Sequence, residues 1–183
     1  MFSFHPYDRV LDVGCGDGIN VKVLRDMGIS RVVGVDVSPF LIKKAKKMNP
    51  KVKFYIAPAE KLPFRVNQFD AVLVDSVFHH LFGYEKPLKE IRRVLKPGGK
   101  LCFIEPRNTI LRRFIDFISL TPIAPAIPII KERSQAYRKA KDRMQHWLAT
   151  QEEFFMWLNK LDMKEVFCHA DFMSIIGKFE KCG

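Results

Sequence analysis

Glycine and acidic residues near the start of the chain form a pattern that suits the binding of a small molecule. Gly14, Gly16 and Gly18 stand at alternate positions, and Asp12 lies two residues ahead of the first. Glycine tolerates a positive φ and lets the backbone approach a ligand closely, and a helix that starts here presents unpaired N–H groups. This stretch, with Cys15 inside it, is predicted to bind a ligand. The alternative is a tight structural turn.

A second acid follows about twenty residues later. Asp36 ends a β-branched run, and a carboxylate in this position can bind both hydroxyls of a ribose. The alternative is an acid that caps the next helix. Because Ser38 already occupies the N-cap position ahead of Pro39, we favour the ribose role.

These residues depend on a regular alternation of predicted strands and helices. Such alternation requires a parallel sheet with right-handed crossovers, in which ligands bind beyond the carboxyl ends of the strands. The strands are predicted at residues 9–13, 31–36, 52–56, 69–75 and 101–105, and the helices at residues 19–27, 40–48 and 84–95. In the first helix the apolar stripe of Ile19, Val23 and Met27, widened by Val21 and Leu24, is predicted to face the core.

The last part of the chain adds one helix and two strands to this alternation. Thr150 and Glu153 are spaced as a capping box ahead of a helix over residues 154–161. Two β-like runs follow, over residues 164–169 and 172–179. They are predicted to be the last two strands of the same sheet.

Four segments resemble those of the S-adenosylmethionine-dependent methyltransferases of the Rossmann-like class. They are VLDVGCGDG at residues 10–18, APAEKLPF at 57–64, SVFHHL at 76–81 and RVLKPGG at 93–99. The resemblance covers roughly residues 9–106. It implies an α/β three-layer sandwich, a mostly parallel seven-stranded sheet of order 3-2-1-4-5-7-6 with an antiparallel strand 7, and a single domain over residues 1–183. The implied cofactor is S-adenosylmethionine.

The resemblance also implies a set of cofactor-binding positions. Asp12 and the glycine turn would hold the methionine part, and Asp36 the ribose. The other implied positions are Gly14, Cys15, Gly16, Gly18, Val37, Pro58, Ala59, Glu60, Asp75 and Ser76. Pro58 stands where the family has an aspartate near the adenine, so we expect Glu60 or a backbone carbonyl to replace that contact. We expect no metal site.

Methyl transfer is an in-line displacement that depends mainly on positioning. An acceptor with a hydroxyl or an acidic carbon must also lose a proton. His79 and His80 are the nearest candidate bases, because imidazole titrates near neutrality. The alternative for both is local packing or hydrogen bonding.

Composition limits the choice of compartment and partner. The 183 residues carry a net charge of +11, which favours an anionic partner or substrate. The four cysteines are far apart in sequence, and the first residues do not resemble a secretory signal. We therefore expect a reduced, cytoplasmic protein without a zinc site.

An insertion over residues 107–148 departs from a minimal domain. Residues 117–130 carry no charge, yet they are too few and too rich in proline to span a bilayer as a helix. Residues 131–148 are predicted to form a basic amphipathic helix with Tyr137, Ala140, Met144 and Trp147 inward. The insertion is predicted to be a lid over the cofactor, a homodimer contact or a peripheral membrane contact, which would make the protein membrane-associated. The alternative for its basic helix is a solvated charged face over a helix packed on the core.

Taken together, the sequence predicts a methyltransferase for a small, lipophilic acceptor such as a prenylated quinone precursor. An RNA or other nucleic-acid methyltransferase would use the basic surface to bind phosphates, but the Asn/Asp-Pro-Pro-aromatic motif of base amino-group methylation is absent after the fourth strand. A non-catalytic cofactor-binding subunit of a complex is a further alternative. A nicotinamide dehydrogenase is disfavoured, because its third glycine would fall at Ile19.

Overall fold

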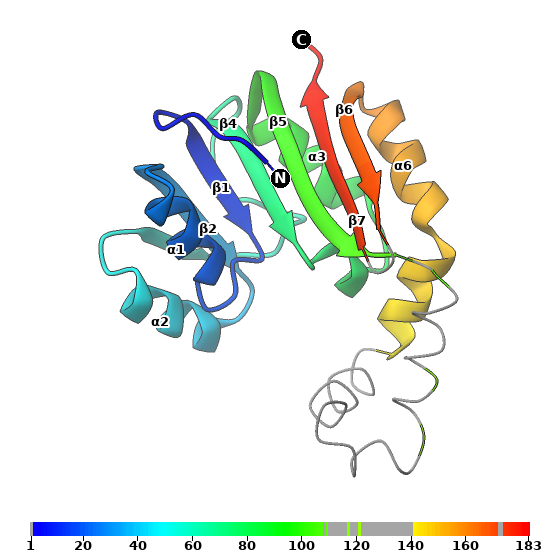
Figure 1. Ribbon diagram of the computed structural model, residues 1–183, viewed down its shortest axis with the longest axis horizontal. Helices are drawn as coiled ribbons and strands as arrows, with labels where there is room; N and C mark the ends of the chain where they lie inside the picture. Colours follow the sequence, from blue (N-terminus) through cyan, green and yellow to red (C-terminus); the bar gives the residue numbers. More distant parts are fainter. Residues whose placement is uncertain (1, 108, 110–116, 118–120, 122–140, 172–173) are drawn as a thin grey trace.

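The computed structural model describes residues 2–107, 109, 117, 121, 141–171 and 174–183. Its centre is a seven-stranded sheet of order β3-β2-β1-β4-β5-β7-β6 (Figure 1). The strands are β1 (Arg9–Val13), β2 (Arg31–Asp36), β3 (Lys53–Ile56), β4 (Phe69–Asp75), β5 (Leu95–Pro106), β6 (Met163–Ala170) and β7 (Ser174–Lys181). Strands β1 to β5 pair in parallel, and β7 is antiparallel to both of its neighbours. The predicted order and direction are confirmed.

Helices cover the two faces of the sheet unequally. The helices are α1 (Ile19–Asp26), α2 (Pro39–Met48), α3 (Glu85–Val94) and α6 (Gln151–Lys160), with a 3-10 turn η1 (Phe78–His80), and residues 141–149 are also helical. Helices α1 and α2 lie on one face, while α3 lies behind the sheet (Figure 1). The larger core cluster joins α3, α6 and residues 141–149 to one face of β1, β2, β4, β5 and β7. A smaller cluster joins α1 and α2 to the other face.

The orientation of α1 differs from the prediction. Val21 and Leu24 are buried, but Ile19, Val23 and Met27 are 51–59% exposed. The apolar residues of this helix extend over more than half of its circumference, so their spacing allows two faces to point inward. The contacts of the folded protein select the face that carries Val21 and Leu24.

Thr150 also departs from its predicted role. It holds the N-cap position of α6, but its side chain accepts no capping hydrogen bond from that helix. Its hydroxyl donates to the carbonyl of His146 at 2.8 Å and lies 2.6 Å from the hydroxyl of Tyr84. Thr150 therefore ties α6 to the preceding helical segment and to the start of α3.

Most of the insertion over residues 107–148 lies outside the described residues, including Tyr137 and Ala140. Met144 and Trp147 are buried as predicted, and the indole N–H of Trp147 donates to the carbonyl of Pro106 at 2.7 Å. Within the described residues, none of the helices has the length and apolar character needed to cross a bilayer.

Candidate functional site

The glycine turn joins the carboxyl ends of three neighbouring strands. The N–H groups of Gly14 and Cys15 both donate to the carbonyl of Val35 in β2, at 2.8 and 3.0 Å. Gly14 has a φ of +73°, and a Cβ at this position would collide with the side chain of Val77, which follows β4. The turn therefore requires glycine at position 14 for both its backbone conformation and its close contact with the β4 loop.

Asp36 connects this turn to α2. Its Oδ2 accepts from the N–H of Gly16 at 2.9 Å, and its Oδ1 accepts from the N–H of Ser38 at 2.8 Å. The predicted N-cap is confirmed, because the hydroxyl of Ser38 accepts from the N–H of Leu41 at 3.3 Å. Asp36 is only 9% exposed, but each of its oxygens has a second lone pair available for a ligand.

Asp12 is a fully buried acid under the same turn. Neither carboxylate oxygen has a hydrogen-bond partner among the described residues. Burial, and then the charges of Asp75 and Asp36, raise the pKa of Asp12 to about 8. Burial also raises the pKa of the neighbouring Cys15 thiol, which is therefore protonated. An unpartnered acid this deep favours a bound cation, because a cation would stabilise its ionised form.

Asp75 and Ser76 lie at the same edge, at the end of β4. The Oδ1 of Asp75 accepts from the hydroxyl of Ser76 at 2.8 Å, and its Oδ2 accepts from the side-chain amide of Asn20 at 3.1 Å. Ser76 has a φ of +59°, which is uncommon outside glycine. Sequence reasoning missed Asn20. Its position in the first turn after the glycines, at the carboxyl edge, is the signal that could have identified it.

Glu105, at the carboxyl end of β5, organises the loop that carries the two histidines. Its Oε1 accepts from the N–H groups of Val77 and Phe78 at 2.7 and 2.6 Å. Its Oε2 accepts from the N–H of His79 at 3.3 Å and lies 2.8 Å from the Nδ1 of the same residue. The carboxylate is completely buried. Sequence reasoning missed Glu105, although it is the last residue of a predicted strand, as Asp36 and Asp75 are.

The two histidines have different surroundings. His79 is 7% exposed, and its Nδ1 lies 2.8 Å from the carboxylate of Glu105. In a neutral ring, a hydrogen bond to this carboxylate places the proton on Nδ1 and the acceptor lone pair on Nε2. The ring of His80 lies 4.0 Å from that of His79, between centroids. Burial lowers the pKa of His80 to about 4, with smaller contributions from His79 and Arg143. His80 is therefore neutral at physiological pH.

The residues that are predicted to lie beside the adenine differ in their exposure to solvent. Val37 follows Asp36 and is 64% exposed, while Ala59 is buried. Pro58 and Glu60 lie on the surface of the loop after β3. Glu60 also lines a cavity of about 620 Å³ together with His80.

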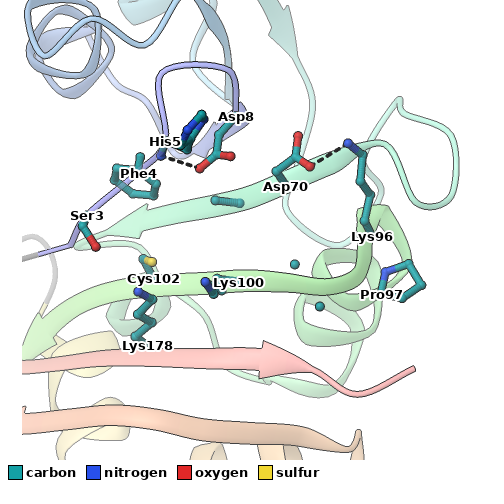
Figure 2. Close-up of a pocket in the computed structure, with 13 residues that line it drawn as sticks. Ser3, Phe4, His5, Asp8, Asp70, Lys96, Pro97, Lys100, Cys102 and Lys178 are labelled. Atoms are coloured by element: carbon teal, nitrogen blue, oxygen red, sulfur yellow. Dashed lines mark hydrogen bonds and ion pairs between the residues drawn. The ribbon is translucent and has the colours of Figure 1, made fainter.

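A second cavity, of about 480 Å³, lies at the opposite edge of the sheet (Figure 2). It is lined by the N-terminal segment and by the starts of β4 and β5, where Lys96 pairs with Asp70 at 2.6 Å. Lys100 and Lys178 lie on its floor (Figure 2). Because ligands of open α/β sheets bind at the carboxyl ends of the strands, this cavity is not the predicted cofactor site.

No group of three potential metal ligands occurs in the part of the chain that the structure describes. The polar groups at the carboxyl edge are carboxylates, backbone N–H groups and imidazoles.

Comparisons with known proteins agree with this geometry. The methyltransferase domain family matches residues 11–103. The chain is 30% identical over 172 residues to the demethylmenaquinone methyltransferase of Renibacterium salmoninarum, covering 88% of this chain and 68% of that protein. It is 29% identical over 189 residues to a ubiquinone/menaquinone biosynthesis C-methyltransferase of Wigglesworthia glossinidia brevipalpis, covering 96% and 72%.

The chain spans 60–63% of the length of three other demethylmenaquinone methyltransferases that it matches. Among solved structures, a methyltransferase from Methanosarcina mazei has the same fold, with a TM-score of 0.72 and 17% identity over 98% of this chain and 94% of that one. The sequence match and the sheet order lead to one assignment. The chain belongs to the methyltransferase domain family, whose members in this fold class use S-adenosylmethionine as their cofactor.

Proposed function

We propose that the protein transfers the methyl group of S-adenosylmethionine to a lipophilic, quinone-type small molecule. The single observation that carries the cofactor assignment is the buried carboxylate of Asp12, which has no partner among the described residues and lies beneath a glycine turn. S-adenosylmethionine presents a sulfonium and an ammonium group, and either positive charge would stabilise the ionised form of this acid.

The other residues at this edge fit the rest of the cofactor. Gly16, where an added Cβ would meet nothing within 4 Å, leaves room for the methionine part beside the N-terminus of α1, while Gly14 and Gly18 shape the turn. Asp36 is already oriented by two backbone N–H groups and would accept the two ribose hydroxyls. Further contacts are proposed for a set of residues around these: Cys15, Val37, Pro58, Ala59, Glu60, Asp75 and Ser76.

The bound cofactor would supply an electrophilic methyl carbon. The residues of this chain contribute mainly by holding that carbon in line with the acceptor, which accounts for about 7–11 kcal/mol of barrier reduction in well-oriented reactions. Glu105 positions the loop from Val77 to His79 at the carboxyl edge, where an acceptor would meet the methyl group. Asp75 is engaged by Asn20 and Ser76, which suits a binding role better than that of a base.

His79 is the proposed base. A proton leaves the acceptor as its carbon or oxygen bonds to the methyl group, and the Nε2 lone pair of His79 would receive it. The carboxylate of Glu105 would then face the resulting imidazolium at Nδ1. The surroundings of His80 disfavour its protonated form, which makes it the weaker candidate.

The acceptor class is inferred from the relatives, which are named for demethylmenaquinone and for ubiquinone and menaquinone biosynthesis. Such acceptors are lipophilic, in agreement with the acceptor that the sequence predicts. The predicted contacts of residues 107–148 with a membrane or with a second copy remain predictions, since most of that segment lies outside the described residues.

Calorimetric titration tests the cofactor assignment. We expect micromolar binding of S-adenosylmethionine and S-adenosylhomocysteine and no binding of NADH. In Asp36→Ala the affinity for both adenosyl ligands is expected to fall about 100-fold, because two hydrogen bonds to a charged carboxylate are lost at about 1.5 kcal/mol each. Asp26→Ala, an exposed change on α1, is the matched control and should leave the affinity unchanged.

If Asp36→Ala fails to fold, Asp36→Asn retains one acceptor oxygen and serves in its place. Unchanged affinity in a folded Asp36 variant would contradict the ribose role. Tight cofactor binding without transfer to any quinone-type acceptor would instead favour a non-catalytic, cofactor-binding subunit.

Substitution of each histidine by glutamine identifies the base. We expect His79→Gln to lower kcat by about 100-fold or more, the lower end of the range for general-base catalysis, with cofactor affinity within threefold of wild type. His80→Gln should stay within about fivefold in kcat. Methyl-transfer kinetics with a short-chain quinone precursor provide the measurement, and the opposite ranking would assign the role to His80.

A further inference from the structure

The water-facing side of α2 combines lysines with exposed apolar side chains. Between Asp36 and Glu60 the chain has six lysines and no acidic residue, although the whole protein carries a net charge of only +11. All six are exposed; they are Lys43, Lys44, Lys46, Lys47, Lys51 and Lys53. Over half of the excess positive charge therefore lies on α2 and the segment that follows it, including the edge strand β3.

Five of the exposed residues of α2 form one continuous stripe. Phe40, Lys43, Lys44, Lys47 and Met48 are spaced three, four, seven and eight positions from the first, which places them on one side of a helix. We call this stripe the lysine face.

The opposite side of α2 carries Ile42 and Ala45, which are buried against the sheet. Phe40 is 66% exposed and Met48 is 42% exposed, so the lysine face has a large apolar side chain at each end. The ammonium group of Lys44 lies 4.6 Å from the centroid of the Phe40 ring. The internal packing of the fold explains neither apolar residue.

Among the helices that the structure describes, α3 and α6 do not share this charge pattern. In α3, Glu85 pairs with Lys89 and Glu90 pairs with Arg93. Helix α6 begins with two acids and has one lysine in its last turn. The lysine face is therefore a local feature of α2.

We propose that the lysine face is a docking surface for an anionic lipid bilayer, a proposal that rests on the lipophilic acceptor proposed above. Lysines provide point charges that suit anionic headgroups, and Phe40 and Met48 would enter the boundary between headgroups and acyl chains. Residues 37–59 contain no arginine, the residue best suited to bidentate phosphate contacts and to base recognition in nucleic acids.

The position of α2 in the fold would bring a docked bilayer close to the proposed cofactor site. Helix α2 begins three residues after Asp36, so its first turn lies at the carboxyl edge where the proposed cofactor site opens. Ten helical residues span about 15 Å. A bilayer against the lysine face would therefore lie within about one helix length of the site, and a lipophilic acceptor would have only a short path to it.

Vesicle flotation with the full chain tests the proposal. Vesicles of phosphatidylcholine containing 30% phosphatidylglycerol are compared with vesicles of phosphatidylcholine alone, in about 0.1 M salt. The test variant carries Lys43→Gln, Lys44→Gln, Lys46→Gln and Lys47→Gln. The matched control carries Lys86→Gln, Lys89→Gln, Lys160→Gln and Lys164→Gln, which removes the same charge from exposed positions elsewhere.

Because each lysine near an anionic surface contributes about fivefold to partitioning, we expect the α2 variant to lose about 100-fold or more and the control less than about fivefold. Phe40→Ala should weaken vesicle binding severalfold without changing the net charge. Equal losses in the two quadruple variants would overturn the proposal, since net charge alone would then govern binding. Tighter binding of single-stranded RNA than of anionic vesicles, lost in the α2 variant, would also overturn it.

Failure of the proposed function is measured separately. Cofactor titration and methyl transfer to a short-chain, water-soluble quinone analogue do not require a bilayer, so both should be unchanged in the α2 variant. Normal transfer without vesicle binding by the wild type would overturn the docking surface alone. Vesicle binding without any transfer would overturn the proposed function alone.

Discussion

Replacement of Glu105 by alanine is expected to lower the free energy of unfolding by about 3–5 kcal/mol, the range for removing one partner of a buried charged group. The carboxylate of Glu105 accepts from three backbone N–H groups and from the imidazole of His79. Its removal would leave these donors buried without partners, at about 1–3 kcal/mol for each unsatisfied group. Since domains are stable by only about 5–15 kcal/mol, this single change would remove a large part of the total.

Denaturant unfolding at constant m-value measures the effect. Glu105→Gln is the milder variant: its amide oxygen still accepts, but its NH₂ group would face backbone donors, so we expect a loss of about 2–3 kcal/mol. Glu153→Ala, at an exposed position in the first turn of α6, is the control and should change stability by less than about 1 kcal/mol.

Glu105→Gln should also lower kcat about 100-fold. Without its hydrogen bonds to Glu105, the loop that carries His79 would shift, and a misplacement of about 1 Å can cost about 100-fold in rate. Wild-type stability and activity in both Glu105 variants would contradict the role assigned to this residue. Loss of stability with full activity would limit that role to folding.

Asp12→Asn is expected to abolish the fall in the free energy of unfolding that Asp12 causes between pH 6.5 and 8. The pKa of Asp12 is raised from 3.8 to about 8, mainly by burial, so the folded protein keeps a proton that the unfolded chain releases. The stabilising contribution of this proton is fully present below pH 4 and is lost as the pH rises toward 8. The expected slope is about −1.4 kcal/mol per pH unit near pH 6.5, and it falls to zero above pH 8.

The difference in slope between wild type and Asp12→Asn isolates this residue. The pKa of His80 is lowered from 6.5 to about 4, so its effect on stability has the opposite sign and fades only about one pH unit above 6.5. Because wild type and Asp12→Asn both keep His80, this effect cancels in the comparison. The raised pKa values of Cys15 and Cys102 act only above pH 9. Unfolding curves at several pH values check the slope, with Asp26→Asn as an exposed control. A slope in Asp12→Asn equal to that of wild type would contradict the assignment.

The same acid links cofactor binding to pH. A bound sulfonium or ammonium group would favour ionised Asp12, so binding at pH 7 should release up to one proton, and affinity should rise with pH up to about 8. Calorimetry in two buffers of different ionisation enthalpy measures that proton. In Asp12→Asn the release should disappear and the affinity should weaken about tenfold or more. Release of a full proton by the variant would assign the titration to another group.

The sequence by itself determined the sheet and the edge at which the candidate site residues meet. Apolar runs such as residues 69–75 are strands because they are buried on both faces, and their alternation with helical segments requires parallel pairing. Since parallel strands all end at one edge, Gly14, Asp36 and Asp75 were predicted to lie together, and they do. Glycine spacing also predicted the turn, because only glycine tolerates both its φ values and its close contacts.

Some local patterns in the sequence allowed more than one structure. The apolar residues of α1 suit two inward faces, and Thr150 has the spacing of a capping box but bonds to Tyr84 and His146 instead. Periodicity determines whether a segment is a helix or a strand, but it does not determine which side of a helix faces the core. A short polar side chain forms hydrogen bonds with the groups that tertiary packing places beside it.

Only the tertiary structure decided which polar groups from different strand ends meet. Glu105 reaches His79 across 26 residues of chain, and Asn20 reaches Asp75 across 55. These pairs depend on strand register and sheet twist, which no local pattern encodes. The unpartnered state of Asp12 depends in the same way on the packing of every element around it. Short-range propensity therefore determined the elements and their shared edge, whereas the hydrogen bonds and charges of the site followed from long-range packing.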